Sequence, residues 1–195
     1  MAKQGDVIEN PATRERIIFR QTAQVTQGTL LQFDDVLQAG GIGPPEHIHP
    51  HQEEHFQVIK GSMGVRIGGQ EQTLRAGESI NIPAGVAHTW WNAGDDELHQ
   101  ITEFRPALKL ETFFETFFGL ARDGKCDKVG QPSFLQISVM VPEYDIYLSR
   151  PPMLMQKVLF AVLGPVARLS GYRASYPQYS RPEASPTLQA SSSGS

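Results

Sequence analysis

Short β-like runs separated by turn signals fill residues 16–105, and this pattern constrains the fold more than any other feature of the sequence. Runs that favour strands are Arg16–Gln21, Thr29–Gln38, Glu54–Lys60, Met63–Ile67, Ser79–Ile82, His88–Asn92 and Leu98–Arg105. Turn signals rich in Gly and Pro separate them, among them Gly43-Pro44-Pro45 and Pro83-Ala84-Gly85. Many short strands at close spacing predict an all-β sandwich or barrel.

The hydrophobic period changes after Pro106. Large apolar residues then recur at steps of three and four: Leu110, Phe113, Phe114, Phe117, Phe118 and Ala121. This period predicts an amphipathic helix that ends near Gly124. Further helices are predicted over residues 132–141 and 152–170. The Phe pairs are too apolar to face water, so we expect them to cover the outer sheet or to pack across a dimer.

These changes of pattern divide the chain into four parts. Residues 1–15 are polar and are predicted to be a flexible N-terminus. Residues 16–105 form the predicted β-barrel, and residues 106–174 form a C-terminal α-helical extension. Residues 175–195 are rich in Ser and Pro and are predicted to be a disordered tail.

All six histidines lie between residues 47 and 99. His47 and His49 are two residues apart, so on a strand their side chains point to the same side. Glu54 is separated from His49 by an odd interval, and the chain must therefore turn between them for both to converge. His88 belongs to a later predicted strand. Three imidazoles and one carboxylate that converge in this way suit a first-row transition metal.

The spacing resembles both sequence motifs of the cupin family. The positions that match the first motif are Gly41, His47, His49, Glu54 and Gly61. The positions that match the second are Gly77, Pro83, Gly85, His88 and Asn92. The resemblance implies a jelly-roll-like antiparallel β-barrel, and it implies that the metal ligands are His47, His49, Glu54 and His88.

The cofactor implied by this ligand set is one divalent transition metal. Iron, manganese, nickel and zinc all accept nitrogen and oxygen ligands, and ligand type does not choose among them. Four protein ligands leave up to two octahedral positions for a substrate or for dioxygen. Glu54 is either a permanent ligand or a residue that detaches and acts as a general base.

The same strand alternation predicts the walls of a substrate pocket. If Glu54 and His88 point inward, then so do Phe56 and Trp90, two residues further along their strands. Core packing is an equally good interpretation of Phe56. His51 follows the predicted turn at Pro50 and is expected at the mouth of the barrel. An apolar cavity beside a metal suits a small organic ligand.

The function that this resemblance favours is a metal-dependent, oxygenase-like enzyme acting on a small organic molecule. Cupins with similar ligands include dioxygenases, oxalate-degrading enzymes, isomerases and polyketide cyclases. A fold alone does not define a reaction. Two alternatives therefore stand beside it: a non-catalytic cupin that binds or senses a small molecule, and a non-redox isomerase or cyclase.

Composition narrows the possible partners. The formal net charge is −4 and Lys and Arg do not cluster, so nucleic acid is not an expected partner. The apolar run Val158–Leu163 is too short for a transmembrane segment. The single cysteine, Cys126, cannot form an internal disulfide, which fits a cytoplasmic protein. The resemblance to small single-domain cupins implies a homodimer.

Overall fold

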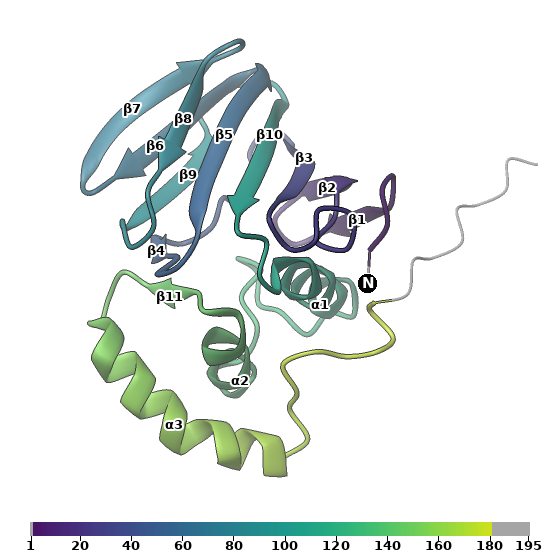
Figure 1. Cartoon of the computed structure of the whole chain (residues 1–195), viewed down its shortest axis with the longest axis vertical. Helices are drawn as coiled ribbons and strands as arrows, with labels where there is room; N and C mark the ends of the chain where they lie inside the picture. Colours follow the sequence, from purple (N-terminus) through teal and green to yellow (C-terminus); the bar gives the residue numbers. More distant parts are fainter. Residues whose placement is uncertain (1, 181–195) are drawn as a thin grey trace, which may run out of the picture.

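Two antiparallel sheets face each other in the computed structural model, and three helices lie at one end of them (Figure 1). The structure describes residues 2–180. The predicted all-β barrel with a helical extension is confirmed. Most of the predicted disordered tail, residues 181–195, lies outside the described residues.

The strands are divided between a six-stranded and a five-stranded sheet. In spatial order, the six-stranded sheet contains β1 (Val7–Asn10), β2 (Glu15–Gln21), β3 (Leu31–Leu37), β10 (Leu98–Arg105), β5 (Glu53–Lys60) and β8 (Ser79–Ile82). The five-stranded sheet contains β11 (Tyr147–Leu148), β4 (His47–Ile48), β9 (His88–Asn92), β6 (Ser62–Ile67) and β7 (Gln70–Arg75).

Alternation along β10 shows how the sequence builds the interior of the barrel. Leu98, Gln100, Thr102 and Phe104 are buried on the inner face, and the residues between them are more exposed. The side chains that form the core between the two sheets are Leu37, Phe56, Val58, Met63, Val65, Leu74, Ile82, Trp90 and Leu98. Each large apolar side chain buried in this way stabilises the fold by about 1.5–3 kcal/mol.

Apart from the two-residue β4 at His47, three strands were not anticipated from the sequence. β1 lies within the N-terminal segment predicted to be flexible, where four residues pair with β2. β7 contains one buried apolar side chain, Leu74, and so lacks an alternating pattern. Six residue pairs with β6 hold it in the sheet. β11 is only two residues long and pairs with β4. Backbone hydrogen bonds, which carry no side-chain signal, define these elements.

Helices α1 (Leu110–Arg122) and α2 (Phe134–Tyr144) close the end of the barrel. The side chain of Ser133 caps α2 by accepting a hydrogen bond from the Gln136 amide. The phenylalanines of α1 do not cover the outer sheet as expected. The Phe114 ring lies 5.1 Å from that of Phe33, whose side chain belongs to the inner face of the six-stranded sheet. Folding α1 back over the open end hides these rings without a second protein chain.

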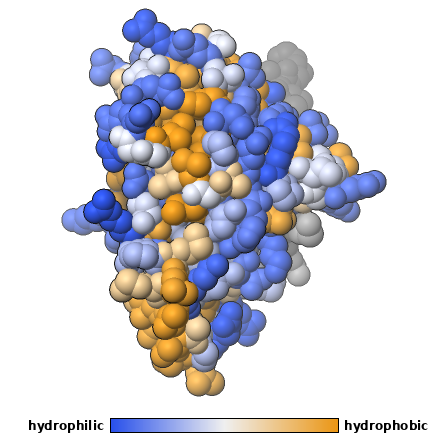
Figure 2. Space-filling view, turned by 60° about the vertical axis from the view of Figure 1, so that its left-hand side comes forward, coloured by the Kyte–Doolittle hydropathy of each residue, from blue (hydrophilic) through white to orange (hydrophobic). Residues whose placement is uncertain are grey.

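Helix α3 (Met153–Leu169) buries only a narrow side, formed by Gln156, Phe160, Gly164 and Ala167. Its exposed apolar residues are called the apolar face of α3: Leu154, Met155, Val158, Leu159, Val162, Val166 and Leu169. Figure 2 shows apolar side chains gathered at the lower end of the molecule, where α3 lies. Within residues 2–180, no helix is long and apolar enough to cross a membrane.

Candidate metal centre

Four buried side chains meet where the two sheets approach the helices. His47 lies in β4 and is paired in register with His88 of β9, both in the five-stranded sheet. His49 follows β4, and Glu54 lies in β5 of the six-stranded sheet. One ligand atom from each of the four residues lies within 4.8 Å of the others. The turn after His49 therefore brings ligands from both sheets together.

The distances between these ligand atoms fit a single metal ion. The Nε2 atoms of His47 and His49 are 3.1 Å apart, and His88 Nε2 is 2.7 Å from Glu54 Oε2. His49 Nε2 is 3.8 Å from the same carboxylate oxygen. Neighbouring ligands about 2.1 Å from a metal lie about 3.0–3.4 Å from each other. Small side-chain adjustments would let all four bind one ion.

Two histidines are oriented by backbone carbonyl groups. His47 Nδ1 lies 2.8 Å from the carbonyl oxygen of Pro45, and His88 Nδ1 lies 2.9 Å from that of Val86. A carbonyl oxygen only accepts hydrogen bonds, so each Nδ1 carries the proton and donates it. The Nε2 atoms of both rings consequently face the cluster, where His88 Nε2 lies within hydrogen-bonding distance of Glu54. This arrangement is typical of histidines that bind metals.

Burial favours the neutral, ligand form of two imidazoles. Burial, with a contribution from the charge of His88, lowers the pKa of His47 to about 3. Burial and the neighbouring His47 lower the pKa of His49 well below its usual range. Burial also acts to lower the pKa of His88, but the charge and hydrogen bond of Glu54 outweigh it and the pKa is raised. Glu54 is therefore the neighbour that favours the protonated form of His88.

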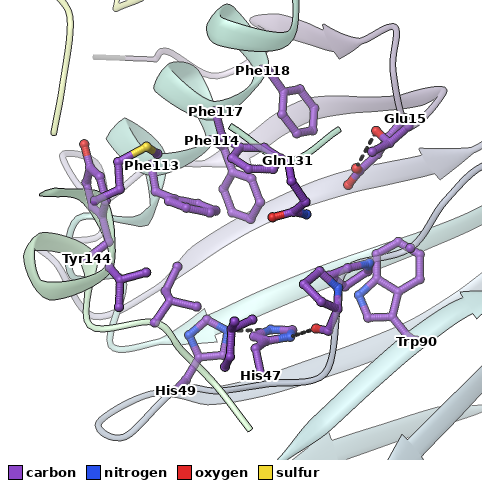
Figure 3. A pocket seen from close by; sticks show the side chains of 18 of the residues that line it. Glu15, His47, His49, Trp90, Phe113, Phe114, Phe117, Phe118, Gln131 and Tyr144 are labelled. Atoms are coloured by element: carbon purple, nitrogen blue, oxygen red, sulfur yellow. Dashed lines mark hydrogen bonds between the residues drawn. The ribbon is translucent and has the colours of Figure 1, made fainter. Parts of the chain in front are cut away.

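A cavity of about 180 Å³ opens onto the cluster. His47, His49 and Glu54 line it, and its remaining walls are mainly apolar. Figure 3 shows His47 and His49 on one side, with the side chains of Phe113, Phe114 and Phe117 projecting from α1 above them. The cluster is thus accessible to a small organic molecule but surrounded by apolar side chains.

Known proteins share this sequence pattern. The family model for the cupin domain matches residues 33–102. An oxidoreductase of Arthrobotrys oligospora is 27% identical over 157 residues, which cover 73% of this chain and 62% of the relative. "Probable oxidoreductase virH" of Hypocrea virens is 30% identical over 158 residues, covering 73% of this chain and 70% of the relative. The chain belongs to the cupin family.

The chain was also compared with solved structures. The RmlC-like cupin of Shewanella frigidimarina aligns with a TM-score of 0.45 and 20% identity, covering 55% of this chain and 89% of that one. The present cupin spans 62% and 70% of the length of the two curated relatives.

The structure separates the predicted pocket residues of this cupin. Trp90 lines the cavity. Phe56 does not: its ring packs 6.0 Å from that of Trp90 in the core between the sheets. Its predicted inward direction agrees with the structure, but its position in mid-strand places it too deep. The His51 side chain is 71% exposed, and its Nδ1 lies 2.5 Å from Asp145 Oδ2, outside the cavity. The turn after Pro50 directs His51 outward.

Several residues that line the cavity of this cupin were not singled out from the sequence. They include Glu15, Asp35 and Thr102. The position of Asp35 could have been predicted from the sequence. Phe33, Asp35 and Leu37 are spaced by two residues in one strand, so all three side chains point to the same face. Glu15 lies one residue before the predicted strand Arg16–Gln21, so the alternation that directs Ile17 and Phe19 inward was not extended to it.

Proposed function

We propose that this cupin is a metal-dependent, oxygenase-like enzyme that acts on a small organic molecule. The centre that would hold one divalent transition metal consists of His47, His49, Glu54 and His88. The supporting observation is that three of these buried side chains border a mainly apolar cavity. When bound, iron, manganese or nickel would supply redox and Lewis-acid chemistry, and zinc would supply Lewis-acid chemistry alone.

The names of the relatives support an oxidoreductase rather than a non-redox isomerase or cyclase. Three curated relatives that align over 73% of this chain are named oxidoreductases. An alignment over 73% of this chain is longer than the barrel and so extends into the helical extension. An oxidoreductase activity of this chain is therefore a stronger proposal than isomerisation or cyclisation.

The side chains have distinct proposed roles. His47 and His88 present fixed Nε2 atoms because backbone carbonyls hold their opposite nitrogens. Glu54 neutralises part of the metal charge, and its carboxylate is also the proposed general base, since it borders the cavity. The apolar walls exclude bulk water, which strengthens electrostatic interactions within the site.

The test is dioxygen uptake by metal-loaded protein with phenolic and diketone substrates. We expect uptake to be abolished in Glu54→Ala and His49→Ala, whereas His55→Ala remains active because His55 lies beside Glu103 on the opposite face of β5. Product formed without dioxygen uptake would support an isomerase or cyclase. Binding without turnover would support the sensing alternative. Full activity in both ligand variants would overturn the proposed site.

We also propose that the protein is a cytoplasmic homodimer. The apolar face of α3 supports a dimer, because exposed apolar surfaces of this kind are typical of interaction sites. The single cysteine supports a reducing compartment. Light scattering at micromolar concentration tests the oligomeric state, and a monomeric mass would contradict it.

A further inference from the structure

Four polar side chains cross the inner face of the six-stranded sheet in a diagonal line. They are Glu54 on β5, Thr102 on β10, Asp35 on β3 and Glu15 on β2. All four line the cavity. We call this set the polar diagonal. The surrounding inner face is mainly apolar, so these positions stand out as groups that a ligand can recognise.

The strand registers produce the first part of the line. Glu54 pairs with Phe104, and the next residue of β10 on the same face is Thr102. Thr102 in turn pairs with Phe33, and the next residue of β3 on that face is Asp35. Each step therefore moves by one strand across the sheet and by two residues along it.

The same rule completes the line. Asp35 pairs with Ile17, and the next residue of β2 on the inner face is Glu15. Gln100, which pairs with Asp35 on the other side, donates a hydrogen bond from Nε2 to Asp35 Oδ2 at 3.2 Å. Thr13 donates from Oγ1 to Glu15 Oε2 at 3.3 Å. In Figure 3, Glu15 lies on the side of the cavity away from His49.

One atom of the polar diagonal lacks a partner. Asp35 and Thr102 are 3% and 2% exposed. Asp35 is hydrogen-bonded to Gln100 and to the carboxyl group of Glu15, whereas Thr102 Oγ1 has no hydrogen-bond partner among the described residues. Buried polar atoms are nearly always hydrogen-bonded in native proteins. Thr102 lines the cavity, so a ligand hydroxyl placed beside it would satisfy this atom.

The opposite wall of the cavity is aromatic. Phe113, Phe114 and Phe117 of α1 line it and remain partly exposed. Aromatic side chains favour planar ring partners through offset or edge-to-face contacts. The cavity measures about 180 Å³. A protein cavity of about 150 Å³ holds one benzene ring, so one or two fused rings match this volume.

We infer that the cavity binds an uncharged compound of one or two fused aromatic rings, with hydroxyl groups along the polar diagonal and the ring against the phenylalanines of α1. This inference names the substrate class of the proposed enzyme and rests on the proposed function only in placing one end of the ligand at Glu54. The binding itself requires no turnover.

Charge argues against an anionic ligand. The residues that line the cavity include no Lys or Arg. Burial raises the pKa of Glu15 to about 7, despite its hydrogen bond with Thr13. Burial and the charge of Glu15 raise the pKa of Asp35 well above its usual range. Away from the metal centre, a carboxylate or phosphate group would lack a counter-charge among these lining side chains, whereas a neutral hydroxyl can donate to either carboxyl group.

The test measures binding of three probes of similar size: 1-naphthol, 1-naphthoate and naphthalene. Calorimetric titrations are made without dioxygen, on metal-loaded and on chelator-treated protein. We expect 1-naphthol to bind at least about tenfold more tightly than either other probe, because it adds a hydrogen bond without adding charge. The fluorescence of Trp90, which lines the cavity, provides a second signal.

Variants then locate the hydroxyl. Thr102→Val is nearly isosteric and removes one unpartnered atom, while Glu15→Leu removes the far end of the polar diagonal. Thr102→Val should weaken 1-naphthol binding about tenfold and leave naphthalene binding unchanged, whereas Glu15→Leu should have this effect only if the hydroxyl lies at the far end of the line. Glu9→Leu, at an exposed position of the neighbouring strand β1, is the matched control. Thr102→Val keeps the test available if Glu15→Leu does not fold.

The outcomes separate this inference from the proposed function. Equal affinity for naphthoate and naphthol, no binding of naphthol, or an unchanged preference in Thr102→Val would overturn it. The expected preference together with a failure of metal binding or dioxygen uptake would support the inference and contradict the proposed enzyme.

Discussion

His88 Nε2 lies 2.7 Å from Glu54 Oε2, although the two residues belong to different sheets. His47 joins the same cluster from the five-stranded sheet. The candidate centre therefore links the two halves of the barrel at the end covered by the helices. A ligand bound there would contact both sheets, so binding and folding are expected to be coupled.

The first prediction concerns metal removal. A metal present at one hundred times its dissociation constant stabilises the folded state by about 2.7 kcal/mol. We expect a chelator to lower the thermal midpoint by about 5–10 °C in scanning calorimetry. Glu54→Ala is the control, because it should show no chelator effect. If neither a chelator nor added metal changes the thermal midpoint of the wild-type protein, the four-ligand site is contradicted.

The second prediction concerns the ligands themselves. His49→Ala should lose most of its bound metal, since His49 Nε2 lies 3.1 Å from His47 Nε2 inside the cluster. His55→Ala should retain it, because His55 faces Glu103 on the other side of β5. Plasma mass spectrometry on untagged protein, never exposed to a nickel column, measures the content. Equal metal in both variants would rule out the assignment of His49.

The third prediction concerns pH. Burial raises the pKa of Glu15 from 4.5 to about 7. Between these values the folded protein keeps a proton that the unfolded chain has lost. The free energy of unfolding contributed by Glu15 is therefore fully present below pH 4.5 and is lost as pH rises through about 7.

Glu15→Gln removes this dependence. We compare the free energy of unfolding of the variant with that of wild type at each pH. This difference should favour the variant by about 1–3 kcal/mol more at pH 8 than at pH 5. Urea unfolding at both pH values measures the difference, and Glu9→Gln on exposed β1 is the control. The same difference at both pH values would show that Glu15 is not a protonated buried carboxyl group.

The fourth prediction concerns a close backbone contact. A Cβ atom on Gly43 would lie 2.0 Å from the carbonyl oxygen of Trp90, so Gly43→Ala must displace the segment that leads to β4. We expect a loss of about 1–3 kcal/mol in the free energy of unfolding. Metal affinity should also fall, because this segment includes Pro45, whose carbonyl orients His47.

Gly94→Ala is the matched control for this contact. Its Cβ would meet nothing closer than 3.6 Å, and stability should change little. Denaturant unfolding and metal titration of both variants decide the point. If Gly43→Ala is destabilised but binds metal with wild-type affinity, the contact at Gly43 does not support the candidate centre.

The fifth prediction concerns the proposed dimer. Val162 on the apolar face of α3 is 66% exposed, and Val162→Asp should convert the dimer to a monomer in light scattering. A charge placed in an apolar interface is costly unless it is paired. Val25→Asp, at a residue 67% exposed in the β2–β3 connection, should leave the mass unchanged. A dimeric Val162→Asp protein would exclude this surface as the interface.

The cluster of His47, His49 and Glu54 illustrates what could be predicted from sequence. Strand alternation and the turn between His49 and Glu54 are local properties, and the interval to His88 matches a family motif. The same local periods distinguished the barrel from the helical extension. Phe56 shows the limit, because alternation gives the direction of a side chain but not its depth.

The sequence by itself determined the fold class, the division into barrel and helices, and the grouping of the four candidate ligands, because each follows from local periodicity or motif spacing. Only the tertiary structure decided that β7 and β11 join a sheet, that α1 closes the cavity, and that Glu15, Asp35 and Thr102 form a line with Glu54. These features depend on the register between strands distant in sequence and on backbone pairing, neither of which leaves a pattern in neighbouring residues.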